Sequence, residues 1–355
     1  APPRAARGAV VDERPLARRR TRAPVVTMTP RLSIVIPVRN GALFVDFAVA
    51  SAQSIPVDDL EILVVDDGST DGTPALLQSL AERDPRLVVV RRDSDHGAAA
   101  ARNEAIRRAR APYVCFLDAD DALRPAIARR LAWHERHPDI VMSFADHETL
   151  LPDGTIEPRH AASWPRFQHF LGEAQGMVRL GPQGFGLLFG ENPVCTTGTM
   201  ARRDALLGAD GFARDLRQAE DWDLWIRLAR RGEIAYSTRI EVLHAVRAGS
   251  LSTEVDSVSR HVAEVVRRHW REAVLRHPGA LLAALSAVQV SRAEQARLRC
   301  RNIAAAAYYG AALLLQPGRA LARDFARALA VLAGLRPPGA TPVEQRARLA
   351  REALS

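Results

Sequence analysis

Three acidic residues end a short apolar run in the first half of the chain. The run is Tyr113–Leu117, and Asp118, Asp120 and Asp121 follow it directly. Because burying an unpaired carboxylate is costly, a strand that leads into these residues must emerge at a sheet edge or a cleft. Carboxylates at alternate positions can share a hard divalent cation such as Mg²⁺ or Mn²⁺, which would bind the phosphates of a nucleotide. The alternative is a solvated acidic turn, since Asp is an ordinary turn residue.

The segments around these acids alternate between strand and helix patterns. Further strands are predicted at Leu32–Pro37, Leu60–Val65 and Leu87–Val90, and helices at residues 42–53, 74–83 and 98–109. Such alternation implies crossover connections and a mostly parallel sheet, in which ligands bind beyond the carboxyl ends of the strands. Pro37, Asp66–Asp67 and Asp118–Asp120 all fall at predicted strand ends. This convergence favours a binding site over a solvated turn.

The middle of the chain, residues 139–252, is less regular. A strand is predicted at Asp139–Phe144, and residues 151–195 suggest a long loop region over the cleft. Residues 233–248 hold two short strand-like runs. Glu220 and Asp221 open a predicted helix, where acids are also favoured simply by the helix dipole.

Composition limits the classes of partner. The 355 residues carry a formal charge of +8, and arginine supplies all of the basic side chains. A basic balance favours anionic partners such as nucleotides or phospholipids. Nucleic-acid binding is not expected, because only 5% of the residues are aromatic and no nucleic-acid motif is present. Cys115, Cys195 and Cys300 are far apart and predict neither a disulfide framework nor a zinc site, which suits a reducing, cytoplasmic compartment.

Both ends of the chain differ from the middle. Residues 1–30 are rich in Arg, Pro and Ala without a period, and we expect a disordered tail, or sequence upstream of a start at Met28. Residues 31–252 form the predicted α/β domain. Residues 253–355 are rich in Ala, Leu and Arg and predict an all-helical annex of four or five helices, with Ser291–Glu294 as a capping box at the start of one of them.

The annex raises the question of a membrane. The longest apolar run, Ile303–Leu315, is shorter than the roughly 18 residues that a membrane-spanning helix requires. Residues 318–335 predict a basic amphipathic helix with Arg319, Arg323 and Arg327 on one face. This helix could attach the protein peripherally to the inner face of an anionic membrane. The alternative is a helix that packs its apolar face on the annex.

Five segments together resemble family 2 glycosyltransferases, which are inverting, nucleotide-sugar-dependent enzymes of the GT-A fold. In order, they are Ser33–Asn40, Val64–Asp71, Gly97 with Ala101–Asn103, Phe116–Asp121 and Glu220–Asp221. The resemblance covers roughly residues 31–252. It implies an α/β protein with a Rossmann-like, mostly parallel sheet flanked by helices, followed by the helical annex.

The resemblance also implies roles for particular residues. The nucleotide would be held by Pro37, Val38, Asp67, Arg102, Asp118 and Ala119. The divalent cation, Mn²⁺ or Mg²⁺, would be held by the DXD residues Asp118 and Asp120. Asp221 would be the general base that takes the proton from the acceptor hydroxyl. Glu220, Asp121 and Trp222 would support these residues or contact the acceptor.

One segment departs from the family pattern. Relatives often carry a metal-binding histidine just before Ser-Leu-Ser, but here Arg247 stands at that place, three residues after His244. Two explanations are open. His244 could complete the metal site from a shifted position, or Arg247 could pair with the diphosphate and weaken the dependence on a metal.

The implied function is sugar transfer from a nucleotide diphosphate-sugar, UDP- or dTDP-linked, to a glycan, lipid-linked or small-molecule hydroxyl. A non-catalytic binding protein of the same fold is one alternative. A second is an aspartyl phosphatase of the haloacid dehalogenase type, which Val114–Leu123 also resembles. That class requires a later lysine, and this chain contains none.

Overall fold

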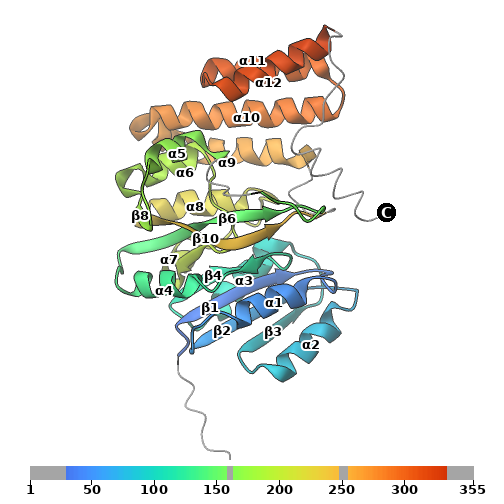
Figure 1. Ribbon diagram of the computed structural model, residues 1–355, viewed down its shortest axis with the longest axis vertical. Helices are drawn as coiled ribbons and strands as arrows, with labels where there is room; N and C mark the ends of the chain where they lie inside the picture. The colour runs from blue at the N-terminus through green and yellow to red at the C-terminus, as the bar shows by residue number, and fades with distance from the viewer. Residues whose placement is uncertain (1–28, 158–162, 248–254, 334–355) are drawn as a thin grey trace, which may run out of the picture.

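The computed structural model describes residues 29–157, 163–247 and 255–333 (Figure 1). Residues 1–28 of the predicted N-terminal tail, the Ser-Leu-Ser segment and the C-terminal residues 334–355 lie outside the described residues. The described chain forms an α/β domain with a stack of helices on one end, as the resemblance implied.

The N-terminal half of the sheet alternates strands with helices. Its strands are β1 (Leu32–Val38), β2 (Leu60–Asp67), β3 (Leu87–Arg92) and β4 (Tyr113–Phe116). The helices between them are α1 (Val45–Gln53), α2 (Thr73–Arg83) and α3 (Ala98–Arg108). The strands lie in the order β3-β2-β1-β4, and all neighbours in this group are parallel. The predicted elements are confirmed to within a few residues.

The second half makes the sheet mixed. It adds β5 (Ala122–Leu123), β6 (Ile140–Leu150), β7 (Ile156–Glu157), β8 (Met177–Arg179), β9 (Met200–Arg202) and β10 (Glu233–Ala245). Strand β9 lies antiparallel between β4 and β6, whereas β6 and β10 are parallel. Every parallel pairing is longer than any antiparallel one. The two strand runs expected in residues 233–248 are one strand, because bulges at Ser237–Ile240 and Ile240–Val242 interrupt its alternation without ending it.

The expected loop region 151–195 contains helices and a strand, so that prediction was wrong. The region holds β8, α5 (Pro165–Leu171), the short 3-10 helix η2 (Gly181–Gln183) and α6 (Gly184–Gly190). Glycine disfavours a helix, which hides α6 in the sequence. Here it permits close packing, since a Cβ on Gly186 would lie 2.8 Å from the His277 Nδ1 atom and one on Gly190 would lie 3.3 Å from the Ala280 Cα atom.

Alternating residues of the central strands fill two cores on opposite faces of the sheet. From β1, Val35 packs with α3 and with α8 (Glu220–Ala229), while Ile34 and Ile36 pack with α1 and with α4 (Ile127–Glu135). This alternation follows from the two-residue period of a strand. Helix α8, which carries the acidic pair, is therefore supported by a rigid sheet. The remaining helix of the domain is α7 (Arg203–Gly208).

The annex contains four helices within the described residues. They are α9 (Val255–Arg276), α10 (Pro278–Leu298), α11 (Asn302–Leu315) and α12 (Arg319–Leu332). Ser291 does not start a helix, because α10 continues through it. The annex shares a core with the α/β domain, in which Trp222 and Ile226 of α8 pack against Val265 and Val266 of α9.

No helix among the described residues is long and apolar enough to cross a membrane. In α12, Ala328 is buried and the Phe325 ring lies 3.2 Å from where a Cβ on Gly310 of α11 would be. Part of the apolar face of α12 therefore packs on α11. Leu329 and Leu332 of the same helix are 45% and 41% exposed.

Candidate active site

The loop after β4 is anchored through Asp121. This carboxylate is 1% exposed and accepts hydrogen bonds from the Thr197 hydroxyl at 2.5 Å, the His244 Nδ1 atom at 3.0 Å and the Ala245 amide at 2.9 Å. Burial lowers the pKa of His244, but the Asp121 carboxylate raises it more, to about 9. Asp121 thus holds the loop in place, and Asp118 and Asp120 extend from a fixed backbone.

Each of these two acids faces an arginine. Arg102 Nη2 lies 2.6 Å from Asp118 Oδ1, and Arg247 Nε lies 2.5 Å from Asp120 Oδ2. The Arg247 guanidinium also lies over the Phe44 ring, 4.1 Å from its centroid. Burial and the nearby Asp121 raise the pKa of Asp120, and Arg247 partly offsets this. Arg247 is therefore the cation that contacts the second acid of the DXD motif.

Arg102 connects the DXD loop to the acidic pair at the start of α8. Its second guanidinium nitrogen, Nη1, donates to Glu220 Oε1 at 2.9 Å, and the side chain stacks over Phe212. Burial lowers the pKa of Arg102, but Asp118 and Glu220 together raise it above its usual range. The sequence placed this arginine near the nucleotide, and the structure places it between two carboxylates.

The acidic pair follows a strained residue. Ala219 has a φ of 60° and a ψ of 17°, a left-handed conformation that costs a non-glycine residue about 1 kcal/mol or more. Asp221 accepts hydrogen bonds from the Thr196 hydroxyl at 2.8 Å and from the Trp222 amide at 2.6 Å. Burial raises the pKa of Asp221, and burial and the neighbouring Asp221 raise the pKa of Glu220 to about 7. The strain and the raised pKa values are typical of a functional site.

The ends of β1 and β2 form a second part of the site. Asp67 is 3% exposed and accepts a hydrogen bond from the His96 amide at 3.1 Å through one carboxylate oxygen. Its other oxygen, Oδ1, accepts no hydrogen bond from the described residues and forms an ion pair with Arg92 at 3.3 Å. Pro37 and Val38 end β1 beside Val65 and Asp66. A buried acceptor oxygen is thus available next to the carboxyl end of the sheet.

Two residues that the sequence did not single out connect these parts. Thr196 donates to Asp221, while Thr197 donates to Asp121 and accepts from the Asp118 amide at 3.0 Å. Both lie in the turn before β9, and no local pattern marks them. Trp222 and Ala119 lie in cores: the Trp222 indole donates to the Leu188 carbonyl at 2.5 Å, which suits packing rather than acceptor contact.

Two groups of side chains could hold a cation. Asp121, Cys195 and His244 place one ligand atom each within 4.8 Å of one another. Asp121 is already fully bonded, however, and burial and Asp121 raise the pKa of the Cys195 thiol well above its usual range. Among the described residues, Asp118 and Asp120 each keep one carboxylate oxygen without a hydrogen bond. Their oxygen-only chemistry fits a hard divalent cation better.

Solved structures share this fold. Staphylococcus aureus TarS (residues 1–349) superposes with a TM-score of 0.56 at 16% identity, over 91% of this chain and 90% of that one. The mannosyltransferase PcManGT from Pyrobaculum calidifontis, in complex with GDP-Man and Mn²⁺, superposes with a TM-score of 0.57 at 17% identity, over 92% and 86% of the two chains. The fold is therefore GT-A.

Sequence relatives agree with this assignment. The Bacillus subtilis putative teichuronic acid biosynthesis glycosyltransferase TuaG is 33% identical over 126 residues, 36% of this chain and 50% of that protein. The succinoglycan biosynthesis protein ExoU of Rhizobium meliloti is 32% identical over 235 residues, 62% and 63% of the two chains. The chain spans half or less of TuaG and of the Pasteurella multocida hyaluronan synthase. Residues 33–206 match the sequence profile described as "Glycosyl transferase family 2", and this part of the chain belongs to that family.

Proposed function

We propose that the chain is an inverting glycosyltransferase that moves a sugar from a nucleotide diphosphate-sugar to a hydroxyl acceptor. One observation carries the proposal. Two segments distant in sequence, the loop with Asp118 and Asp120 and the start of α8 with Asp221, are joined by Arg102 and by the pair Thr196–Thr197. A merely solvated acidic turn needs no such long-range support.

Asp221 is the proposed general base. Inversion is a single displacement at the anomeric carbon, so one carboxylate must accept the proton of the attacking hydroxyl. The hydrogen bonds from Thr196 and Trp222 hold this carboxylate in one orientation. The raised pKa of Asp221 makes it a stronger proton acceptor than an exposed aspartate. Glu220 fixes Arg102 and keeps the acidic pair in register with the DXD loop.

The donor is proposed to lie across the ends of β1, β2 and β4. The Oδ1 atom of Asp67, which is near Arg92 but accepts no hydrogen bond from the described residues, can accept the ring N–H of a pyrimidine, which favours a UDP- or dTDP-sugar. Pro37, Val38 and Ala119 offer backbone groups nearby. TarS was solved in complex with UDP-GlcNAc and with UDP, and PcManGT with GDP-Man. These complexes support a nucleotide-sugar donor but do not distinguish a pyrimidine from a purine base.

Asp118 and Asp120 are proposed to hold a divalent cation. When bound, Mn²⁺ or Mg²⁺ would neutralise charge on the diphosphate leaving group. Of the two explanations left open for the departure from the family pattern, the contacts favour Arg247, because its guanidinium faces Asp120, whereas His244 faces Asp121. Arg247 is 41% exposed and can turn toward a diphosphate.

Chelation tests this role of Arg247. In excess EDTA, we expect measurable transfer to remain, because the guanidinium can balance phosphate charge, and we expect Arg247→Ala to abolish that residual transfer. The matched control is Arg239→Ala, an exposed arginine on β10, the strand that precedes Arg247 in the chain. Release of the nucleoside diphosphate with and without Mn²⁺ is the measurement. Complete loss of the wild-type activity on chelation would contradict the proposed role.

Thr196→Val tests the orientation of the base. The Thr196 hydroxyl lowers the pKa of Asp221, so its removal raises that pKa further. Because the base must be deprotonated, the acid limb of the kcat/KM profile is expected to move to higher pH. On the limb, the rate should fall about tenfold, since a hydrogen bond to a charged group is worth about 1.5 kcal/mol. Thr196→Ser should keep the wild-type profile. If the acid limb of Thr196→Val did not move, the group that titrates on this limb would not be one that Thr196 contacts.

The function itself is tested by a screen of nucleotide-sugars. Release of the nucleoside diphosphate is measured over a panel of UDP-, dTDP- and GDP-sugars with glycan, lipid-linked and small-molecule acceptors. Binding of a donor without turnover across the panel would favour the non-catalytic alternative. The aspartyl-phosphatase alternative gains no support, because Asp118, the nucleophile it requires, is paired with Arg102.

The acceptor and the location belong to the same proposal. TuaG and ExoU carry names from teichuronic acid and succinoglycan biosynthesis, which favours a glycan or lipid-linked acceptor here. We keep 31–252 as the catalytic domain and 253–355 as the annex. Peripheral attachment through α12 to the cytoplasmic face of a membrane would use the exposed Leu329 and Leu332, since Phe325 and Ala328 pack on the other annex helices.

A further inference from the structure

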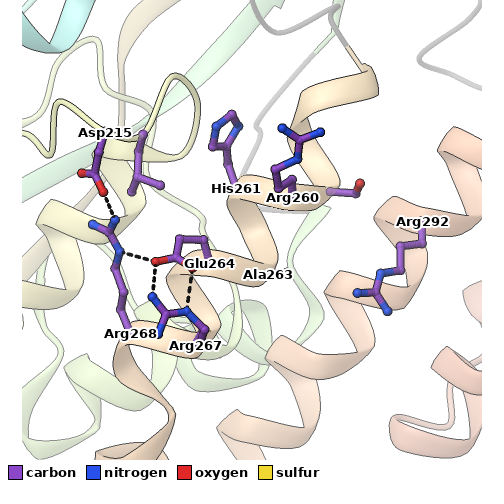
Figure 2. Close-up of a pocket in the computed structure, with 10 residues that line it drawn as sticks. Asp215, Arg260, His261, Ala263, Glu264, Arg267, Arg268 and Arg292 are labelled. Carbon is purple, nitrogen blue, oxygen red and sulfur yellow. Dashed lines mark hydrogen bonds and ion pairs between the residues drawn. The ribbon is translucent and has the colours of Figure 1, made fainter.

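A pocket lies where the annex meets the α/β domain (Figure 2). Its volume is about 690 Å³, within the usual size range of ligand sites. Helix α9 supplies seven of its lining residues and α10 supplies Arg292. Asp215 and Leu216 complete it, and they come from the segment that leads into Glu220. The annex and the approach to the acidic pair thus form one cavity.

The charges that line this pocket do not balance. Four arginines face two acids. Glu264 pairs with Arg267 at 2.7 Å and with Arg268 at 3.1 Å, and Arg268 also contacts Asp215. Hydrogen bonds from Arg267 and Arg268 lower the pKa of Glu264 to about 2, so this acid stays ionised. Both acids are therefore used by the same two arginines.

The other two arginines have no acidic partner among the described residues. Arg260 of α9 and Arg292 of α10 make no ion pair or side-chain hydrogen bond within the described part of the chain, and Figure 2 shows both guanidinium groups beside the cavity. The Nδ1 atom of His261 is buried and also makes no hydrogen bond there. With histidine neutral, the pocket carries two surplus positive charges. Arginine forks of this kind match carboxylates and phosphates.

The pocket is connected to the proposed base through α8. Asp223 lies two residues after Asp221, about 3 Å along the helix axis. It accepts a hydrogen bond from His269 Nε2 at 2.9 Å and lies 3.8 Å from a guanidinium nitrogen of Arg268. The donor side of the site, around Asp67 and Asp118, uses other elements. The pocket therefore adjoins α8 and the segment that leads into it, on elements that the proposed donor site does not use.

We infer that this pocket binds a carboxylate or phosphate of the acceptor, and thus that the acceptor is an anionic saccharide or glycosyl phosphate polymer. Arg260 and Arg292 pair with the anionic group of the acceptor. Arg267 and Arg268 line the pocket and are held in place by their ion pairs with Glu264 and Asp215. The inference rests on the proposed function, because only a transferase needs an acceptor near Asp221.

Binding to the full chain without donor tests the inference, by titration calorimetry at fixed low ionic strength. The soluble probes are tetragalacturonate, its neutral counterpart galactotetraose and a glycerol phosphate trimer. Vesicles of phosphatidylglycerol and phosphatidylcholine form a separate arm. The test variant is Arg260→Gln/Arg292→Gln. The control is Arg271→Gln/Arg301→Gln, which removes the same charge from exposed positions outside the pocket.

An anionic soluble probe is expected to bind, and galactotetraose is not. The pocket variant should weaken that binding by about tenfold or more, while the control changes it by about twofold or less through general screening. The probe that binds distinguishes carboxylate from phosphate. Asp221→Asn should bind the probe as the wild type does. Failure of the proposed transfer activity and failure of the probe to bind in the pocket are therefore distinguishable results.

Three outcomes would overturn the inference. The first is that no anionic soluble probe binds. The second is that both double variants lose the same affinity, which would reduce the effect to net charge. The third is that the pocket variant loses only vesicle binding, which would assign the pocket to a lipid headgroup instead of the acceptor.

Discussion

Asp221→Asn is expected to lower kcat by about 10²–10⁴-fold, the usual contribution of a general base. The amide cannot accept the hydroxyl proton, but it keeps the shape of the carboxylate. Its carbonyl oxygen can still accept one of the hydrogen bonds from Thr196 and the Trp222 amide. Affinity for the donor should change little, since Asp221 belongs to α8 and the donor is proposed to bind at β1, β2 and β4. Single-turnover kinetics and equilibrium binding of the nucleoside diphosphate measure the two effects.

Two neighbouring acids serve as controls for this prediction. Glu220→Gln weakens an ion pair with Arg102 and is expected to lower kcat less than Asp221→Asn does. Asp223→Asn breaks contacts with Arg227 and His269 and is expected to lower the melting temperature rather than kcat. If Asp221→Asn kept more than about a tenth of the activity, this would be far more activity than remains when a general base is removed. The base would then be another group.

The second large effect is expected in stability. Arg130 and Glu241 form an ion pair at 2.8 Å in which both side chains are 1% exposed. Arg130 also donates to the carbonyl groups of Ser143 and Gly198, so it supports the turn that carries Thr196 and Thr197. Arg130→Met leaves Glu241 buried without its cation, which is expected to cost about 3–5 kcal/mol of unfolding free energy. Urea unfolding followed by circular dichroism measures this cost.

A matched surface pair gives the control. Arg31 pairs with Glu135, also on α4, but the two side chains are 46% and 33% exposed. Water screens this pair, so Arg31→Met should cost about 1 kcal/mol or less. The double variant Arg130→Met/Glu241→Leu should lose less than the sum of its single variants, because no buried charge is left alone. Equal costs for Arg130→Met and Arg31→Met would show that burial does not govern the pair.

The order of the elements could be predicted from the sequence alone. The alternation of apolar strands and amphipathic helices from Leu32 to Phe116 is local, and each segment reports its own period. The acids at the strand ends followed from the same reasoning, since a carboxylate can leave the core only where a strand ends. An annex of four or five helices was also predicted, but the start predicted at Ser291 lies inside α10. The local pattern gave wrong predictions at two places. It missed helix α6, which is rich in glycine, and it divided β10 into two runs because bulges interrupt the strand.

The side-chain contacts of the site were decided by the tertiary structure. Asp118 meets Thr197, which lies 79 residues later, and Asp120 meets Arg247, which lies 127 residues later. The role of Arg102 as a bridge and the surplus charge of the annex pocket depend on contacts of the same long-range kind. The apolar pattern of a segment shows which of its residues face the core. The partner of each side chain depends instead on how distant segments pack, and no local pattern contains that information. The sequence alone therefore determined the fold class and identified the acidic residues of the site. Only the tertiary structure decided which arginine pairs with which acid, because these partners come from distant segments.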